Sequence, residues 1–169
     1  MTKAIAHGTS SSHGDTRVLR FALYLPYGAR QVWGAVATPV GLPGWLAAAD
    51  VFESRLGGRV TLRWLQESTV AAGTVTAWDV EHVAEYTLSV YGRIRFHLES
   101  VGRRASVLRF TNEFTGPDGL RLDRLAGWHQ HFEFLHDALA GRPKDWSAQD
   151  PEHWRRLRDG YRSVCAEHD

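Results

Sequence analysis

Residues 104–140 read RASVLRFTNEFTGPDGLRLDRLAGWHQHFEFLHDALA. Along residues 104–115 apolar side chains alternate with polar ones, which is the period of a strand with one buried face. A Gly-Pro-Asp-Gly break follows at residues 116–119. Over residues 121–140 the apolar positions recur every three or four residues, as in an amphipathic helix: Leu125, Trp128, Phe132, Leu135 and Leu139. A strand followed by a long helix with one apolar face predicts a helix that covers a sheet.

Upstream of this stretch, short apolar segments bounded by Gly, Pro or Asp predict further strands: residues 17–25, 51–55, 59–65, 70–80, 83–90 and 93–100. Residues 28–38 have helical spacing, Pro39 ends that helix, and residues 43–46 form a second short apolar turn or helix. Short connections favour antiparallel pairing. The expected fold is therefore α+β, with a curved antiparallel sheet of about seven strands around a long C-terminal helix and two short helices after the first strand.

The length of 169 residues suits a single domain. Residues 1–16 are rich in Ser, Gly and His without periodicity, and we expect a flexible N-terminal tail there. The domain itself spans residues 17–141, and residues 142–169 form a C-terminal extension. Asp150 before Pro151 is typical of a helix start, so this extension is expected to contain a short packed helix.

The composition excludes several classes of protein. Lys plus Arg number 20 and Asp plus Glu 19, a net charge of +1 that offers no field to attract nucleic acid. The single cysteine, Cys165, excludes an intramolecular disulfide. The sequence contains no run of about 18 apolar residues, so it predicts no membrane span. The N-terminus lacks the apolar segment of a signal peptide, so we expect a cytoplasmic protein.

The order and spacing of these features resemble the START/SRPBCC superfamily, whose Bet v 1-like domains have the helix-grip fold. The chain looks most similar to single-domain bacterial relatives of the activator of the 90-kDa heat-shock protein ATPase. The resemblance covers residues 17–161, and its motifs are Val32-Trp33-x-Ala35 with Pro39, Trp45-Leu46, Gly57-Gly58-Arg59, Gly73, Gly92, Phe110-Thr111-Asn112, Ala126-Gly127-Trp128, and Trp154 with Leu157 and Tyr161.

This resemblance implies an apolar cavity between the sheet and the long helix. Seven Trp and seven Phe supply aromatic side chains that could line such a cavity. The residues expected to contact a ligand are Trp45, Trp64, Phe96, Leu98, Phe110, Asn112, Trp128, His129 and Phe132. Among them, Asn112 shares a strand face with Phe110 and His129 lies beside the apolar helix stripe, so these two polar groups could orient the ligand.

The histidines do not predict a metal site. His129 and His136 are seven residues apart, roughly 10.5 Å along a helix, which is too far for one ion. His129 with Glu133 would give two ligands, and His97 on a strand could add a third, but no metalloprotease-type spacing is present. We expect no metal, no cofactor and no nucleophilic catalytic residue.

The favoured interpretation is a binding protein for a small hydrophobic molecule such as a lipid or a polyketide. A cyclase or hydrolase that uses the same cavity, with His129 or His97 as acid or base, is an alternative. A third is a protein-interaction module like the heat-shock ATPase activator. That co-chaperone carries a separate chaperone-binding domain, so a chaperone role here would require the module to bind alone. A homodimer through the sheet edge or terminal helix stays open.

Overall fold

The computed structural model describes residues 5–168, with side chains for residues 5–163. It is an α+β structure in which one antiparallel sheet has the strand order β1-β2-β8-β7-β6-β5-β4-β3. The elements along the chain are β1 (Thr9–His13), β2 (Thr16–Leu25), α1 (Ala29–Val36), the 3-10 turn η1 (Leu42–Gly44), β3 (Ala47–Phe52), β4 (Arg59–Trp64), β5 (Val70–Asp79), β6 (Val83–Leu88), β7 (Gly92–Ser100), β8 (Ser106–Thr115), α2 (Asp118–Leu139) and α3 (Pro151–His168).

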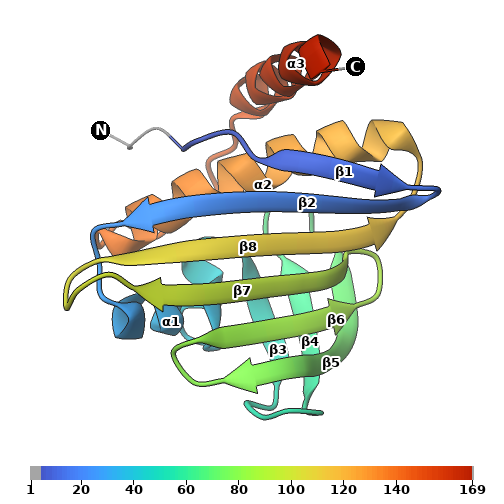
Figure 1. The fold of residues 1–169 in the computed structure, drawn as a ribbon. Coiled ribbons are helices and arrows are strands. Elements are labelled where there is room, and N and C mark those ends of the chain that lie inside the picture. The colour runs from blue at the N-terminus through green and yellow to red at the C-terminus, as the bar shows by residue number, and fades with distance from the viewer. Residues whose placement is uncertain (1–4, 169) are drawn as a thin grey trace.

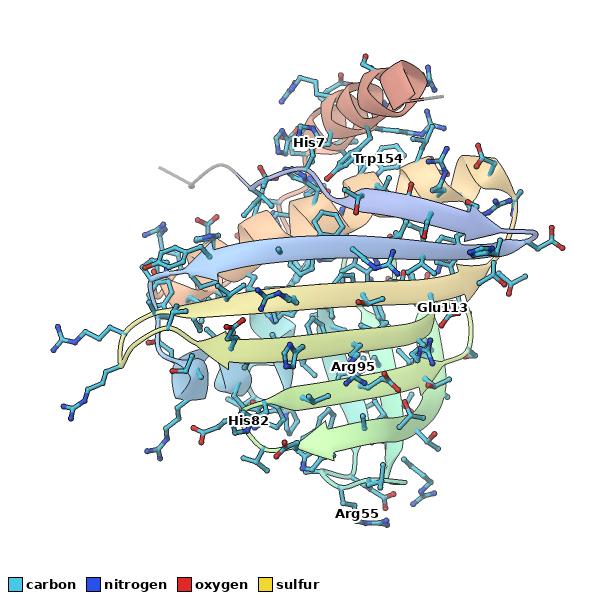
Figure 2. All side chains as sticks on the ribbon, viewed as in Figure 1. His7, Arg55, His82, Arg95, Glu113 and Trp154 are labelled. Carbon is cyan, nitrogen blue, oxygen red and sulfur yellow. The ribbon has the colours of Figure 1, made fainter. Side chains whose placement is uncertain are left out.

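The sheet bends strongly, so that β3 and β4 lie behind the other strands in Figure 1. Helix α2 runs along the concave side of β2 and β8, while α3 lies beyond α2 at the β1 edge. Arg95 and Glu113 belong to the opposite, convex face of the sheet (Figure 2). Consequently, the long helix covers one face of the sheet, as the sequence predicted.

The expected number of strands is too low by one. The tail predicted over residues 1–16 contains β1, whose Ser12 pairs with Arg17 and whose Thr9 pairs with Arg20 on β2. This edge strand is polar and mostly exposed, so it lacks the apolar alternation by which strands are found in a sequence. Its turn uses Gly14 at a φ of 59°, a left-handed conformation that glycine adopts without strain. Residues 1–4 of the expected tail lie outside the described part of the chain.

The boundaries of the other elements differ from the predicted ones by only a few residues. Strand β3 begins at Ala47 rather than near residue 51, and its pairing with β4 shifts between Ala49 and Val51. Helix α2 begins at Asp118, and α3 begins at Pro151 after Asp150, whose carboxylate accepts the backbone N–H of His153 at 3.1 Å. The acidic residue before the proline therefore caps this helix as its position suggested.

Aromatic rings fill the core between α2 and the sheet. Phe96 and Phe110 are directly opposite each other on β7 and β8, with ring centroids 5.3 Å apart. Phe132 of α2 packs 5.0 Å from Phe110, and Trp45 lies 6.0 Å from Phe96. All four side chains are at most 1% exposed. The centre of the helix–sheet interface is thus occupied by protein.

The β5–β6 pair depends on Gly73. A Cβ atom at this position would lie 1.8 Å from the backbone oxygen of Thr87, whereas a Cβ at Gly119 of α2 would meet nothing within 4 Å. Backbone atoms cannot move aside as a flexible side chain can, so the two strands approach closely only because residue 73 has no side chain.

We predict that Gly73→Ala lowers the free energy of unfolding by about 2–3 kcal/mol, because the added methyl group must push β5 and β6 apart. Gly119→Ala is the matched control and should be neutral or stabilising by about 0.5–1 kcal/mol through helix propensity. Urea unfolding of both variants measures the difference. Equal stability of the two variants would contradict this account of the strand contact.

Candidate functional site

A pocket of about 500 Å³ opens at one end of the helix–sheet interface. Its walls come from the connection between β4 and β5, the turn between β6 and β7, the first half of α2, and the start of α3. Trp64, Tyr91 and Trp128 are almost completely buried and form its aromatic floor, with Leu120 and Trp154 completing the apolar lining. Figure 2 shows Trp154 between α3 and α2. The C-terminal extension therefore closes one side of the pocket.

The three rings of the aromatic floor hold one another in place. Trp64 stacks on Tyr91 with centroids 4.0 Å apart and planes 18° apart, and Trp128 meets Trp64 edge to face at 6.1 Å. The Tyr91 hydroxyl donates a hydrogen bond to Glu67 at 2.9 Å. Burial, reinforced by the charge of Glu67, raises the pKa of the Tyr91 phenol, so this group stays a neutral donor.

Asn112 connects this floor to the sheet. Its Nδ2 donates to the backbone oxygens of Tyr91 at 2.8 Å and Arg93 at 3.0 Å, and its Oδ1 accepts from Trp128 Nε1 at 3.1 Å. The residue is 0% exposed, and its bonds to Tyr91 and Trp128 are buried, while the bond to Arg93 is partly buried. The amide thereby fixes the indole ring of Trp128 directly and holds the backbone of Tyr91, so Asn112 acts as a positioning residue.

We predict that Asn112→Ala lowers the free energy of unfolding by about 2–4 kcal/mol, because it leaves a buried indole N–H and two buried carbonyls without their partner. Thr111→Ala, on the neighbouring position of β8 that points to the other face, should change stability by less than about 0.5 kcal/mol. Chemical denaturation followed by tryptophan fluorescence tests both. A loss at Asn112 no larger than that at Thr111 would show that the network is not important for folding.

The structure brings two of the nine expected ligand-contacting residues, Trp64 and Trp128, to the pocket. The other seven are buried and lie outside the lining of this pocket: Trp45, Phe96, Leu98, Phe110, Asn112, His129 and Phe132. The rings of Trp45, Phe96, Phe110 and Phe132 pack against each other in the middle of the interface. Alternation on the strands and helical spacing on α2 indicate which residues face inward, but an inward-facing residue can fill a core as well as line a cavity.

His129 joins α2 to α3 and to the N-terminal segment. Its Nδ1 shares a hydrogen bond of 2.7 Å with the Tyr161 hydroxyl. The same hydroxyl accepts a hydrogen bond from the backbone N–H of Gly8 at 2.9 Å. His7 is adjacent, with its ring centroid 5.5 Å from that of His129. Burial, with the nearby His7 and His153, lowers the pKa of His129 to about 4. This histidine is therefore a neutral contact between elements. His97 lies on β7 between inward-facing neighbours and points to the convex face.

Sequence reasoning missed His131, which lies on the pocket wall and is 3% exposed. Its Nδ1 is 2.9 Å from the backbone oxygen of Trp45, and burial lowers its pKa to about 4. Tyr91 and Arg124 were missed too. Tyr91 sits in a turn, and Arg124 lies on the polar flank of α2, so neither belongs to an apolar pattern that would have identified it.

The low pKa values of His129 and His131 make stability depend on pH. In the unfolded chain a histidine has a pKa of about 6.5, so between pH 6.5 and 4 the unfolded state binds more protons and stability falls as pH falls. We expect the free energy of unfolding to be flat between about pH 7 and 9 and to drop by on the order of 3 kcal/mol by pH 4, chiefly through His131.

Urea titrations at several pH values measure this slope. Replacing both histidines by glutamine should flatten the curve between about pH 6.5 and 5, above the range in which carboxylates titrate, and a slope that persists there in the double variant would refute the assignment.

Among the residues that the structure describes, no three His, Cys, Asp or Glu side chains converge in a way that could hold a metal ion. In the same residues, no helix combines the length and apolar character needed to cross a membrane. Cys165 lies in α3 beyond the last described side chain.

Comparisons with known proteins concern the fold. No protein-family model and no curated protein sequence matches the chain. EF2215 from Enterococcus faecalis, a conserved protein of unknown function, is 14% identical with a TM-score of 0.73 over 96% of this chain and 92% of that one. The crystal structure of CalU16 from Micromonospora echinospora is 14% identical in sequence and has a TM-score of 0.73, over 96% of this chain and 98% of that one. The solution structure of the BPP1335 product from Bordetella parapertussis is 20% identical in sequence and has a TM-score of 0.66, over 96% of this chain and 93% of that one. These similarities show that the architecture recurs over the whole chain.

Proposed function

We propose that this protein binds a small aromatic, largely apolar molecule in the pocket between α2, α3 and the β4–β5 connection. The observation that carries the proposal is the aromatic floor of Trp64, Tyr91 and Trp128 beneath a space of about 500 Å³. Ligand sites typically enclose about 300–1,000 Å³ and are lined mainly by apolar and aromatic groups with a few polar ones. This pocket has that size and that lining.

The binding energy would come mainly from removal of apolar ring surface from water. Burial of an aromatic group contributes on the order of 1.5–3 kcal/mol, and offset stacking adds about 0.5–1.5 kcal/mol. The floor rings are held by each other and by Asn112, so little side-chain freedom remains to be lost on binding. A ligand with two ring systems would then bind in the micromolar range, on the order of 8 kcal/mol.

We further propose that the architecture is a helix-grip fold of the START/SRPBCC superfamily. In support, a bent antiparallel sheet surrounds a long helix that follows its last strand, and two short helical segments follow β2. In this protein the ligand would occupy one end of the helix–sheet interface rather than its centre, since Phe96, Phe110 and Phe132 fill the centre.

The proposal can be tested with a substitution on α2 whose side chain fills the pocket. Gly127 of α2 lies on the pocket wall, and a Cβ added there would meet nothing within 4 Å. We expect Gly127→Leu to fold, because leucine favours a helix over glycine by about 0.5–1 kcal/mol, and to project its side chain into the pocket. The affinity for the neutral fluorescent probe N-phenyl-1-naphthylamine should fall by at least about tenfold, the effect of losing roughly 1.4 kcal/mol of contact.

Gly119→Leu is the matched control. It makes the same change in the same helix at an exposed position where an added Cβ also meets nothing within 4 Å, and it should leave probe binding intact. Fluorescence titration gives both dissociation constants. No saturable binding to the native protein, or equal binding by both variants, would reject this pocket as the site.

A further inference from the structure

Arg124 of α2 is a cation held inside the pocket wall. Its guanidinium carbon lies 4.8 Å from the ring centroid of Tyr91 and 4.5 Å from that of Phe114, between the two rings. Its Nη2 donates to the backbone oxygen of Val90 at 2.8 Å. Its Nη1 is shielded from solvent and has no hydrogen-bond acceptor among the described residues.

Within the described part of the chain, no carboxylate lies within 4.0 Å of Arg124. Glu67 attracts it through space without a direct ion pair, and burial opposes the charge and lowers the pKa of the guanidinium. Buried N–H groups almost always have an acceptor, and a buried charge that lacks a partner costs several kcal/mol in general. The pocket therefore contains one strong donor whose acceptor the protein does not supply.

The carboxylates around the pocket are already engaged. Asp123 accepts from Arg158 Nε at 2.5 Å, Asp150 caps α3, and Glu67 accepts from the Tyr91 hydroxyl. Each acid thus has a donor from the protein, whereas Arg124 has a free donor. None of these acids accepts a hydrogen bond from Arg124 Nη1. An oxyanion on a ligand would match the guanidinium well, because two of its oxygens can bind two N–H groups.

We propose that the ligand is an aromatic molecule with an oxyanion such as a carboxylate or sulfonate, and that Arg124 binds this group while the floor of Trp64, Tyr91 and Trp128 binds the rings. This inference rests on the proposed function. Pairing through Nη1 requires a small rotation of the guanidinium toward the pocket. The oxyanion would lie near the β6–β7 turn and the ring system would extend toward Trp154.

A structural role for Arg124 is the rival explanation. Val90 adopts a φ of 70°, which is strained for a β-branched residue, and Arg124 holds its carbonyl. If support of this turn were the only role, replacement of Arg124 would weaken the binding of charged and neutral ligands alike. A ligand role predicts a larger loss of affinity for the charged ligand than for the neutral one.

Two probes with the same rings separate these roles. 8-Anilinonaphthalene-1-sulfonate carries a sulfonate, and N-phenyl-1-naphthylamine lacks it. We expect the native protein to bind the sulfonate at least about tenfold more tightly, in line with a charge-assisted hydrogen bond in a buried site. In Arg124→Gln this preference should fall below about twofold, because the charged probe loses more affinity than the neutral one.

Arg109→Gln is the control for net charge, because Arg109 pairs with Glu99 on the convex face and lies away from the pocket. It should keep the full preference for the sulfonate. If Arg124→Gln does not fold, Arg124→Lys serves instead, since it keeps a charge and one donor for Val90 but has no second nitrogen, and it should show a reduced preference.

The outcomes distinguish this inference from the proposed function. Binding of the neutral probe without any preference for the sulfonate overturns the inference and leaves the function standing. A preference that survives Arg124→Gln, or a parallel loss of both probes in that variant, also overturns it. If neither probe binds the native protein, the proposed function itself fails.

Discussion

The hydrogen bonds of Asn112 tie together the three elements on which the pocket depends. The amide lies on β8, holds the first residues of β7 through two backbone oxygens, and receives the indole N–H of Trp128 from α2. A buried polar group is stable only when its bonds are made, so this contact permits one position of the helix against the sheet. The ring of Trp128, and through it that of Trp64, is oriented as a result.

The position of the pocket follows from how the rest of α2 is packed. Toward its C-terminal half, the helix meets rings from β2 and β8 at centroid distances near 5 Å, as between Phe21 and Phe132, and this region is filled. Toward its N-terminal half, Gly127 leaves open space beside Trp128, and α3 with Trp154 closes the far side. The combination of a glycine on the helix and a covering terminal helix creates room at one end of the interface.

Much of the fold could be predicted from the sequence, because alternation and helical spacing report which side of an element is buried. The strands from β4 to β8 and the helix with Trp128 and Phe132 were found in this way. Strand β1 was not, because a polar edge strand is specified by backbone pairing with β2. The site was harder to predict. Periodicity separates inside from outside, but it cannot tell Phe110, which fills the core, from Trp64, which borders a pocket, since that depends on how neighbouring rings pack. Arg124 lay outside every apolar pattern, so its position in the pocket could be seen only in three dimensions.

The most direct test uses the seven tryptophans, whose indole N–H groups each give one signal in a ¹H–¹⁵N correlation spectrum. The protein would be titrated with N-phenyl-1-naphthylamine and the indole signals followed. We predict that the signals of Trp64, Trp128 and Trp154 move together and saturate, while those of the tryptophans away from the pocket stay in place: Trp33, Trp45, Trp78 and Trp146. Movement of Trp45 without Trp64 and Trp154 would place the ligand in the centre of the interface and contradict this account.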